Sequence, residues 1–190
     1  MNSDLLLQTL RSRVSVPDGE FQEYIAMASS RHYKKNEHLF RGGDIPRFSY
    51  FITQGCIRSY HVGKDGTERM TLFAEEAIGR VTLRICGQAR QLNLQAVEDT
   101  DVIVLTRDKW ELAYERFTWL RAIHAMGQQR RGAKLAEHVG HLLTDTPETN
   151  YLRLLKEQPK LLQRVPHYIA SYLGISPETL SRIRKKLSAS

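Results

Sequence analysis

The sequence predicts an α+β protein with three parts: a strand-rich N-terminal part, one long helix and a C-terminal helix-turn-helix. Up to about residue 116, short runs of alternating apolar and polar residues are separated by turn residues, which is typical of strands. Apolar residues at three-and-four spacing then predict a long helix. The last forty residues contain two short apolar-periodic segments and most of the net positive charge.

The N-terminal part is expected to be a β sandwich, jelly roll or roll, because its strands are short and closely spaced. A helix around Phe21–Ser29 should precede these strands. The Asp65-Gly66 pair predicts a hairpin, since it provides the positive φ of a tight turn. Further turn residues stand at 42–44 and 54–55. The expected strands begin at His38 and cover residues 48–52, 57–62, 69–73, 92–97 and 101–105.

The middle part predicts one helix over roughly Thr118–Leu143, about 40 Å long. So long a helix, with three internal glycines, needs packing support. Two surfaces could pack against this helix: a partner helix across a dimer axis, or the protein's own β domain. The apolar positions of this helix are Leu120, Ile123, Leu135, Val139 and Leu142.

The C-terminal segment predicts two helices joined by a tight turn. Gly174 suits a helix end with positive φ, Ser176 suits an N-cap, and Pro177 suits a first helical position. This pattern is typical of a helix-turn-helix whose second helix enters the DNA major groove. The apolar residues that should face inward are Ile169, Leu173, Ile175, Leu180, Ile183 and Leu187.

The opposite face of the second helix carries the candidate DNA contacts. Arg182 can bond guanine in a bidentate manner, and Glu178 can accept from cytosine N4. Residues nearer the helix ends suit phosphates, which position a protein without specifying sequence. The candidates for base contact are Pro177, Glu178, Ser181, Arg182 and Lys185, and those for phosphate contact are Ser176, Thr179 and Lys186.

The charge distribution supports a polyanionic partner at the C-terminal end. The 190 residues carry a net charge of +7. Residues 151–190 hold eight Lys or Arg against two Glu, a net +6, which leaves +1 for the first 150. Neither a long apolar run nor a basic-then-apolar start is present, so we expect a cytoplasmic protein without membrane attachment. Two cysteines are too few for a disulfide scaffold, a four-cysteine zinc site or a four-cysteine iron–sulfur cluster.

Together these motifs resemble the Crp/Fnr family of bacterial transcription regulators over nearly the whole chain. The resemblance rests on the turns at 42–44, 54–58 and 65–66, on residues 96–101, and on the C-terminal motif 169–182. It implies a β-roll of cyclic-nucleotide-binding type (1–116), a dimerisation helix (117–144) and a winged helix-turn-helix (145–190) with a shortened wing. In that family the residues matching Glu178 and Arg182 read bases. Pro177 replaces the family's usual second Arg, so the operator sequence should differ.

The segment matching the family's phosphate cassette departs from its pattern. Gly79 is followed by Arg80 instead of Glu, and Gln91-Leu92 stands where Arg-Ser/Thr is usual. We therefore expect that cyclic AMP does not bind in the ordinary way and that another effector is used. The candidate effector-pocket residues are Gly79, Arg80, Arg84 and Arg90.

Three other interpretations are open at this point. A small cupin-like β-barrel could be a metal-dependent enzyme, but His32, His38 and His61 are scattered and Glu137 is the only acid near His138 and His141. We therefore expect neither catalysis nor a metal site. An effector-independent DNA-binding protein and a haem sensor with His or Cys ligands are the other two. The expected partners are double-stranded DNA with a pseudo-palindromic operator, a second copy of the chain and, as a further candidate, RNA polymerase.

Overall fold

The computed structural model describes residues 3–45, 47–75, 80–81, 92–164, 166 and 168–188. In these residues the chain has the predicted α+β architecture and forms two compact units. One unit comprises the described residues of 1–59 and 73–131, and the other comprises those of 60–72 and 132–190. Helix α4 (Thr118–Thr144) is continuous across residue 131, where the two units meet in the sequence.

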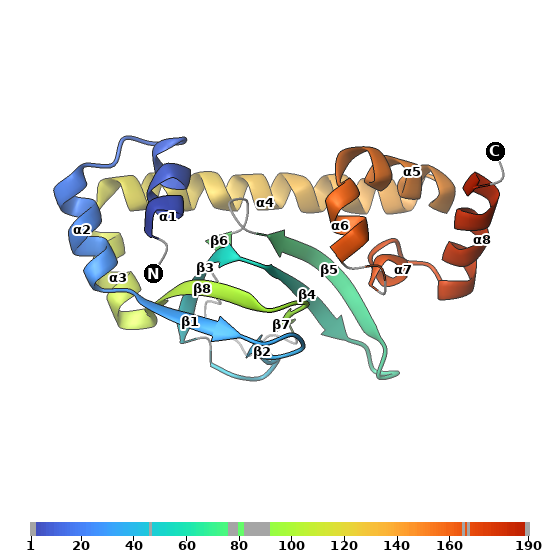
Figure 1. Ribbon diagram of the computed structural model, residues 1–190, viewed down its shortest axis with the longest axis horizontal. Coiled ribbons are helices and arrows are strands. Elements are labelled where there is room, and N and C mark those ends of the chain that lie inside the picture. Colours follow the sequence, from blue (N-terminus) through green and yellow to red (C-terminus); the bar gives the residue numbers. More distant parts are fainter. Residues whose placement is uncertain are drawn as a thin grey trace. The chain divides into compact units, whose positions relative to one another are not determined.

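The described strands form two four-stranded sheets (Figure 1). The first has the order β1-β8-β3-β6 and the second has the order β2-β7-β4-β5. All five expected segments and the start at His38 are strands, with ends that differ by one or two residues. The bounds are β1 Ser29–Tyr33, β2 His38–Phe40, β3 Phe48–Gln54, β4 Cys56–Val62, β5 Glu68–Glu75, β6 Arg80–Val81, β7 Leu92–Ala96 and β8 Thr100–Thr106.

Strands β3 and β8 of the first sheet are buried on both faces, which explains the continuous apolar run of β8. Val102 and Val104 point into a core that also contains Ile52, Ile57 and Leu94. The alternate residues Ile103 and Leu105 lie in a second core. Successive side chains of a strand point to opposite faces, so a strand buried on both sides carries apolar residues at every position.

Helices of the N-terminal unit supply the rest of the second core. These are α1 Ser3–Arg11, α2 Asp18–Ala26, α3 Arg107–Arg116 and the first part of α4. Leu6 and Leu10 of α1 are buried there beside Phe21 of α2 and Trp110 of α3. Helix α1 was not predicted from the sequence.

The prediction of a helix over Phe21–Ser29 was wrong at both ends. Helix α2 begins at Asp18, next to Pro17, whose extended conformation suits the position before a helix. Ser29 belongs to strand β1 and pairs with Val104 of β8. Strand β1 lacks apolar alternation because four of its five residues are exposed, so its sequence does not predict a strand.

Two of the expected turns depend on glycine. Gly66 has a φ of +77° in the hairpin between β4 and β5, where Gly63 N–H donates to Thr67 O over 2.8 Å. Gly55 has a φ of +98°, and a Cβ there would lie 2.5 Å from Thr100 Oγ1. Glycine is therefore needed at position 55 for both backbone conformation and space.

The C-terminal unit contains four further helices: α5 Pro147–Glu157, α6 Pro159–Arg164, α7 Ile169–Tyr172 and α8 Pro177–Ser188. Helix α5 begins at Pro147, with Thr146 as its N-cap. Helix α6 starts at Pro159. Proline is tolerated in the first turn of a helix, where its missing N–H has no intrahelical partner. Within the described ranges, none of the helices combines the length and apolar character needed to cross a bilayer.

Candidate nucleic-acid interface

Helices α7 and α8 are joined by the tight turn that the sequence predicts. Gly174 has a φ of +66°, in the left-handed region that glycine adopts readily. Ile175 N–H donates to Ala170 O over 3.0 Å, and Gly174 N–H donates to Ser171 O over 3.2 Å. These bonds satisfy the last carbonyls of α7 and allow the chain to change direction before α8.

Ser176 caps the start of α8. Its Oγ accepts from Thr179 N–H over 3.2 Å, and its carbonyl accepts from Leu180 N–H over 3.1 Å. Pro177 is the first helical residue. The predicted N-cap is thus present, and the first turn of α8 is fixed by local hydrogen bonds.

The inner face of the motif is close to the expected apolar set. Ile169, Leu173, Leu180 and Ile183 are buried. Leu187 and Ile175 are only half-buried, so these two contribute less than predicted. The inner side chains hold α8 against α7 and leave its other face in solvent.

The exposed face of α8 carries the predicted contact residues. Those that are exposed are Ser176, Pro177, Glu178, Ser181, Arg182, Lys185 and Lys186. Thr179 is half-buried, because its hydroxyl lies 3.2 Å from Ser176 Oγ and accepts from Arg182 Nη2 over 3.1 Å. A hydrogen bond from Ser176, together with the charge of Arg182, holds the pKa of Glu178 below its ordinary value. Glu178 is therefore anionic at neutral pH and can accept hydrogen bonds.

Two basic residues of α8 are engaged by α5, which the sequence reasoning did not foresee. Lys186 Nζ lies 2.8 Å from Glu148 Oε2. Arg184 Nε donates to Tyr151 Oη over 3.3 Å, and its guanidinium lies 5.7 Å from the centre of the Tyr151 ring. The helical period could have predicted the inward position of Arg184. This residue stands four positions after buried Leu180 and therefore lies on the same face of α8.

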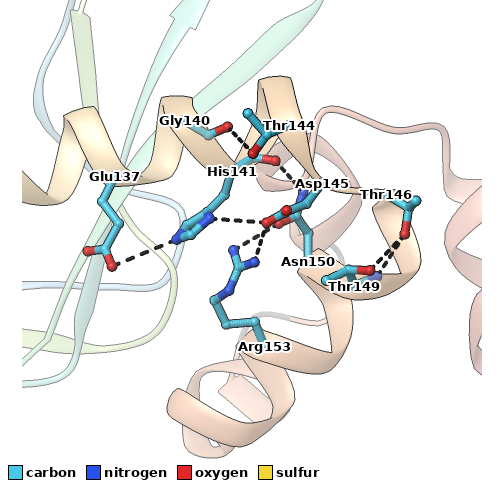
Figure 2. A network of polar contacts seen from close by, with 9 residues as sticks. All are labelled: Glu137, Gly140, His141, Thr144, Asp145, Thr146, Thr149, Asn150 and Arg153. Atoms are coloured by element: carbon cyan, nitrogen blue, oxygen red, sulfur yellow. Dashed lines mark hydrogen bonds and ion pairs between the residues drawn. The ribbon is translucent and has the colours of Figure 1, made fainter.

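A polar network fixes the connection between α4 and α5 (Figure 2). His141 Nδ1 lies 3.1 Å from Asp145 Oδ2, and its Nε2 lies 3.7 Å from Glu137 Oε1. Arg153 forms an ion pair with Asp145 and donates to Asn150 Oδ1 over 3.0 Å. The hydrogen bond and charge of Arg153 hold the pKa of Asp145 below its ordinary value. The statement that Glu137 is the only acid near His141 was therefore wrong.

Other contacts attach α7 within the same unit. The rings of His138 and Tyr172 are stacked, with centroids 4.3 Å apart and an interplanar angle of 14°. Ser171 Oγ donates to Glu68 O over 2.9 Å and accepts from Met70 N–H over 3.1 Å. The first helix of the motif is thus held by α4 and by the start of β5.

The predicted effector pocket lies almost wholly outside the described residues. Gly79, Arg84 and Arg90 are not among them, and of Arg80 only the pairing of its backbone with Phe51 in β6 and β3 is described. Arg58, which the sequence reasoning did not single out, is buried in β4 and donates from Nε to Gln95 Oε1 over 2.7 Å. In the part of the chain that the structure describes, no group of three or more His, Cys, Asp or Glu side chains could hold a metal ion.

Comparison with known proteins gives the class of this fold. Residues 30–117 match the family model described as Cyclic nucleotide-binding domain. FixK2 from Bradyrhizobium japonicum has a similar structure (TM-score 0.72, 21% identity, 85% of each chain). The c-di-GMP-responsive global regulator CLP of Xanthomonas campestris also has a similar structure (TM-score 0.68, 19% identity, 91% of this chain and 92% of that one). A third similar structure is that of the catabolite activator protein of Thermus thermophilus (TM-score 0.59, 22% identity, 95% of this chain and 87% of that one).

No curated protein matched the sequence. The chain carries a cyclic nucleotide-binding domain and has the fold of the Crp/Fnr transcription regulators. The resemblance and the fold class predicted from the sequence are thereby confirmed.

Proposed function

We propose that this protein is a sequence-specific DNA-binding transcription regulator of the Crp/Fnr type. The observation that carries the proposal is the two-sided character of α8. Leu180 and Ile183 anchor its inner face, whereas Glu178, Arg182 and Lys185 are exposed on the outer face. A capped, rigidly packed helix with polar and basic residues on its free side suits the major groove.

The roles of the individual side chains follow from their chemistry. Arg182 would donate two hydrogen bonds to guanine O6 and N7, and Glu178 would accept from cytosine N4. Ser176 and Thr179, at the start of α8, and Lys186, near its end, would contact phosphates. Pro177, Ser181 and Lys185 complete the face that enters the groove.

We propose further that the functional form is a homodimer joined along α4. Three of the apolar residues of α4 are about two-fifths exposed: Leu135 at 43%, Val139 at 44% and Leu142 at 38%. A second copy of the same helix would cover them. Two recognition helices related by a two-fold axis then require a pseudo-palindromic operator whose half-sites lie about one helical turn apart.

The effector should differ from cyclic AMP, because Arg80 and Gln91-Leu92 replace the family's acidic and basic residues that hold the ribose and phosphate. Gly79, Arg80, Arg84 and Arg90 remain the candidate pocket residues. Titration calorimetry should show no tight, stoichiometric binding of cyclic AMP. An absorbance spectrum of the purified protein tests the haem alternative directly.

The remaining assignments follow from the same proposal. The β-roll would occupy 1–116, the dimerisation helix 117–144 and the DNA-binding domain 145–190. The protein would regulate in the cytoplasm without catalysing a reaction, and RNA polymerase would be a further partner.

The decisive experiment selects bound fragments from a genomic library and then titrates the enriched duplex and a scrambled duplex at several salt concentrations. We expect a shared pseudo-palindromic sequence and an affinity at least about a thousandfold higher for it than for the scrambled duplex. An absence of enrichment, with equal affinity for both duplexes, would contradict sequence-specific binding.

A further inference from the structure

The ion pair between α5 and α8 is placed where the proposed interface meets the DNA backbone. Glu148 Oε2 lies 2.8 Å from Lys186 Nζ, although the two residues are 38 positions apart in the sequence. The Lys186 side chain is 68% exposed and that of Glu148 is 34% exposed. The pair is therefore accessible to solvent and would be accessible to a phosphate.

This pairing distinguishes Lys186 from Arg182, because the partner of Lys186 belongs to another helix. In the first turns, Arg182 donates to the neutral hydroxyl of Thr179, and its charge also acts on the carboxylate of Glu178 in the same helix. Near the end of the helix, the carboxylate of Glu148 offsets the ammonium of Lys186. The basic residue that we assign to a phosphate near the end of α8 is thus already paired with a carboxylate of another helix.

Folding stability does not account for the pair, because exposed ion pairs contribute little to it. Its effect on a polyanion is larger. A lysine that neutralises a phosphate releases condensed counterions, and this release dominates sequence-independent affinity. A lysine already neutralised by a carboxylate brings no net charge to the DNA, and the carboxylate itself repels the phosphate.

We propose that Glu148 is a positioning residue that weakens backbone binding by neutralising Lys186, and so sets the overall affinity of the interface for DNA of any sequence. The proposal rests on the DNA-binding function proposed above. It assigns to α5 a role in binding, although α5 is not the recognition helix. Specificity, which is the ratio between matched and mismatched duplexes, is left to Glu178 and Arg182.

The test is a double-mutant cycle of Glu148→Gln and Lys186→Ala, measured on matched and scrambled duplexes over a range of salt. We expect Glu148→Gln to tighten binding to both duplexes about threefold per half-site, since one repulsive charge near the phosphate is removed. The slope of log affinity against log salt should steepen by about one unit per half-site. Lys186→Ala should weaken both duplexes alike and make that slope shallower by a similar amount.

The double variant should return close to the wild-type affinity and salt slope, because the pair and its neutral replacement carry the same net charge. Glu157→Gln is the matched control: it removes the same charge from the exposed C-terminal end of α5. Melting temperatures of all variants, measured without DNA, should agree within a few degrees.

The outcomes separate the two proposals. If Glu148→Gln and Glu157→Gln change affinity and salt slope equally, Glu148 acts only through net charge and this inference is wrong, while the proposed function stands. If Glu148→Gln alters the ratio between matched and scrambled duplexes, its role lies in base reading and the inference is again wrong. If the wild-type protein binds neither duplex, the proposed function fails and this inference fails with it.

Discussion

The two halves of α4 differ in what covers their apolar side chains. In the first half, Leu120 is fully buried and Ile123 is 5% exposed, both within the core of the N-terminal unit. In the second half, Leu135 and Val139 are more than 40% exposed. Apolar residues at the same spacing are thus buried in a core in the first half and exposed at the surface in the second half.

The periodicity of the helix explains why one sequence pattern has two outcomes. At about 100° per residue, Leu135, Val139 and Leu142 lie roughly 100° around the helix from Leu120 and Ile123. The five residues that suggested one stripe therefore form two. The two supports considered for this helix, its own β domain and a second copy of the chain, are consequently not exclusive. The first is observed for the N-terminal half, and the second is proposed for the C-terminal half.

The largest expected effect tests the buried half. Leu120→Ala removes a side chain with no exposed surface from the core, so it should lower the free energy of unfolding by about 2–5 kcal/mol. Denaturant unfolding followed by circular dichroism measures this. Leu135→Ala is the comparison variant, and it should lower the free energy of unfolding of the monomer by much less. Equal costs would mean that the two halves do not differ as described.

The next effect tests the exposed half. Leu135→Asp places a charge in the proposed dimer surface and should raise the dimer dissociation constant at least tenfold. Sedimentation of the wild-type protein at micromolar concentration should give a dimer, and the variant should shift toward a monomer. Ala133→Asp adds the same charge to an exposed position on the opposite side of α4 and should leave the dimer intact. A monomeric wild-type protein, with and without DNA, would contradict the dimer.

The contrast between covered and uncovered faces extends to α8. Arg182→Ala should cost about 1–3 kcal/mol of binding to the preferred duplex and reduce discrimination at one base pair, because the bidentate contact is lost. Binding titrations on matched and singly mismatched duplexes measure both. Arg107→Ala, which removes the same charge from exposed α3, is the control. Unchanged affinity and base preference in Arg182→Ala would mean that α8 is not the reading helix.

The smallest expected effect concerns the contact between α4 and α7. Burial lowers the pKa of His138, and the nearby charge of His141 adds to this effect. The folded state therefore favours neutral His138, and its contribution to stability is present at neutral pH and lost as pH falls below the ordinary histidine pKa of about 6.5. Melting temperature should decline in this range in the wild type, and less steeply in His138→Phe, which keeps the stack on Tyr172. Identical pH profiles would exclude this role.

Much of the fold and of the candidate interface could be predicted because the signals are local. Gly174, Ser176 and Pro177 fix the turn and the start of α8 through their own backbone preferences, which do not depend on distant residues. The alternation in β4 and the Asp65-Gly66 turn likewise act within a few residues. These elements therefore lie close to where the sequence places them.

Other features depend on contacts that no local pattern encodes. Polar β1 is a strand because it pairs with β8, and α1 is fixed because Leu6 and Leu10 reach a core formed by α2 and α3. Such pairing is a matter of which surfaces meet after folding, and it overrides local propensity.

The sequence by itself determined the order of the parts, the helix-turn-helix and the side chains that α8 exposes. Only the tertiary structure decided that Glu148 neutralises Lys186 and that Asp145 joins His141 to Arg153. It also decided that one half of α4 is buried while the other is not. The physical reason is that charge pairing and burial depend on distances between segments, and these distances exist only once the chain has packed.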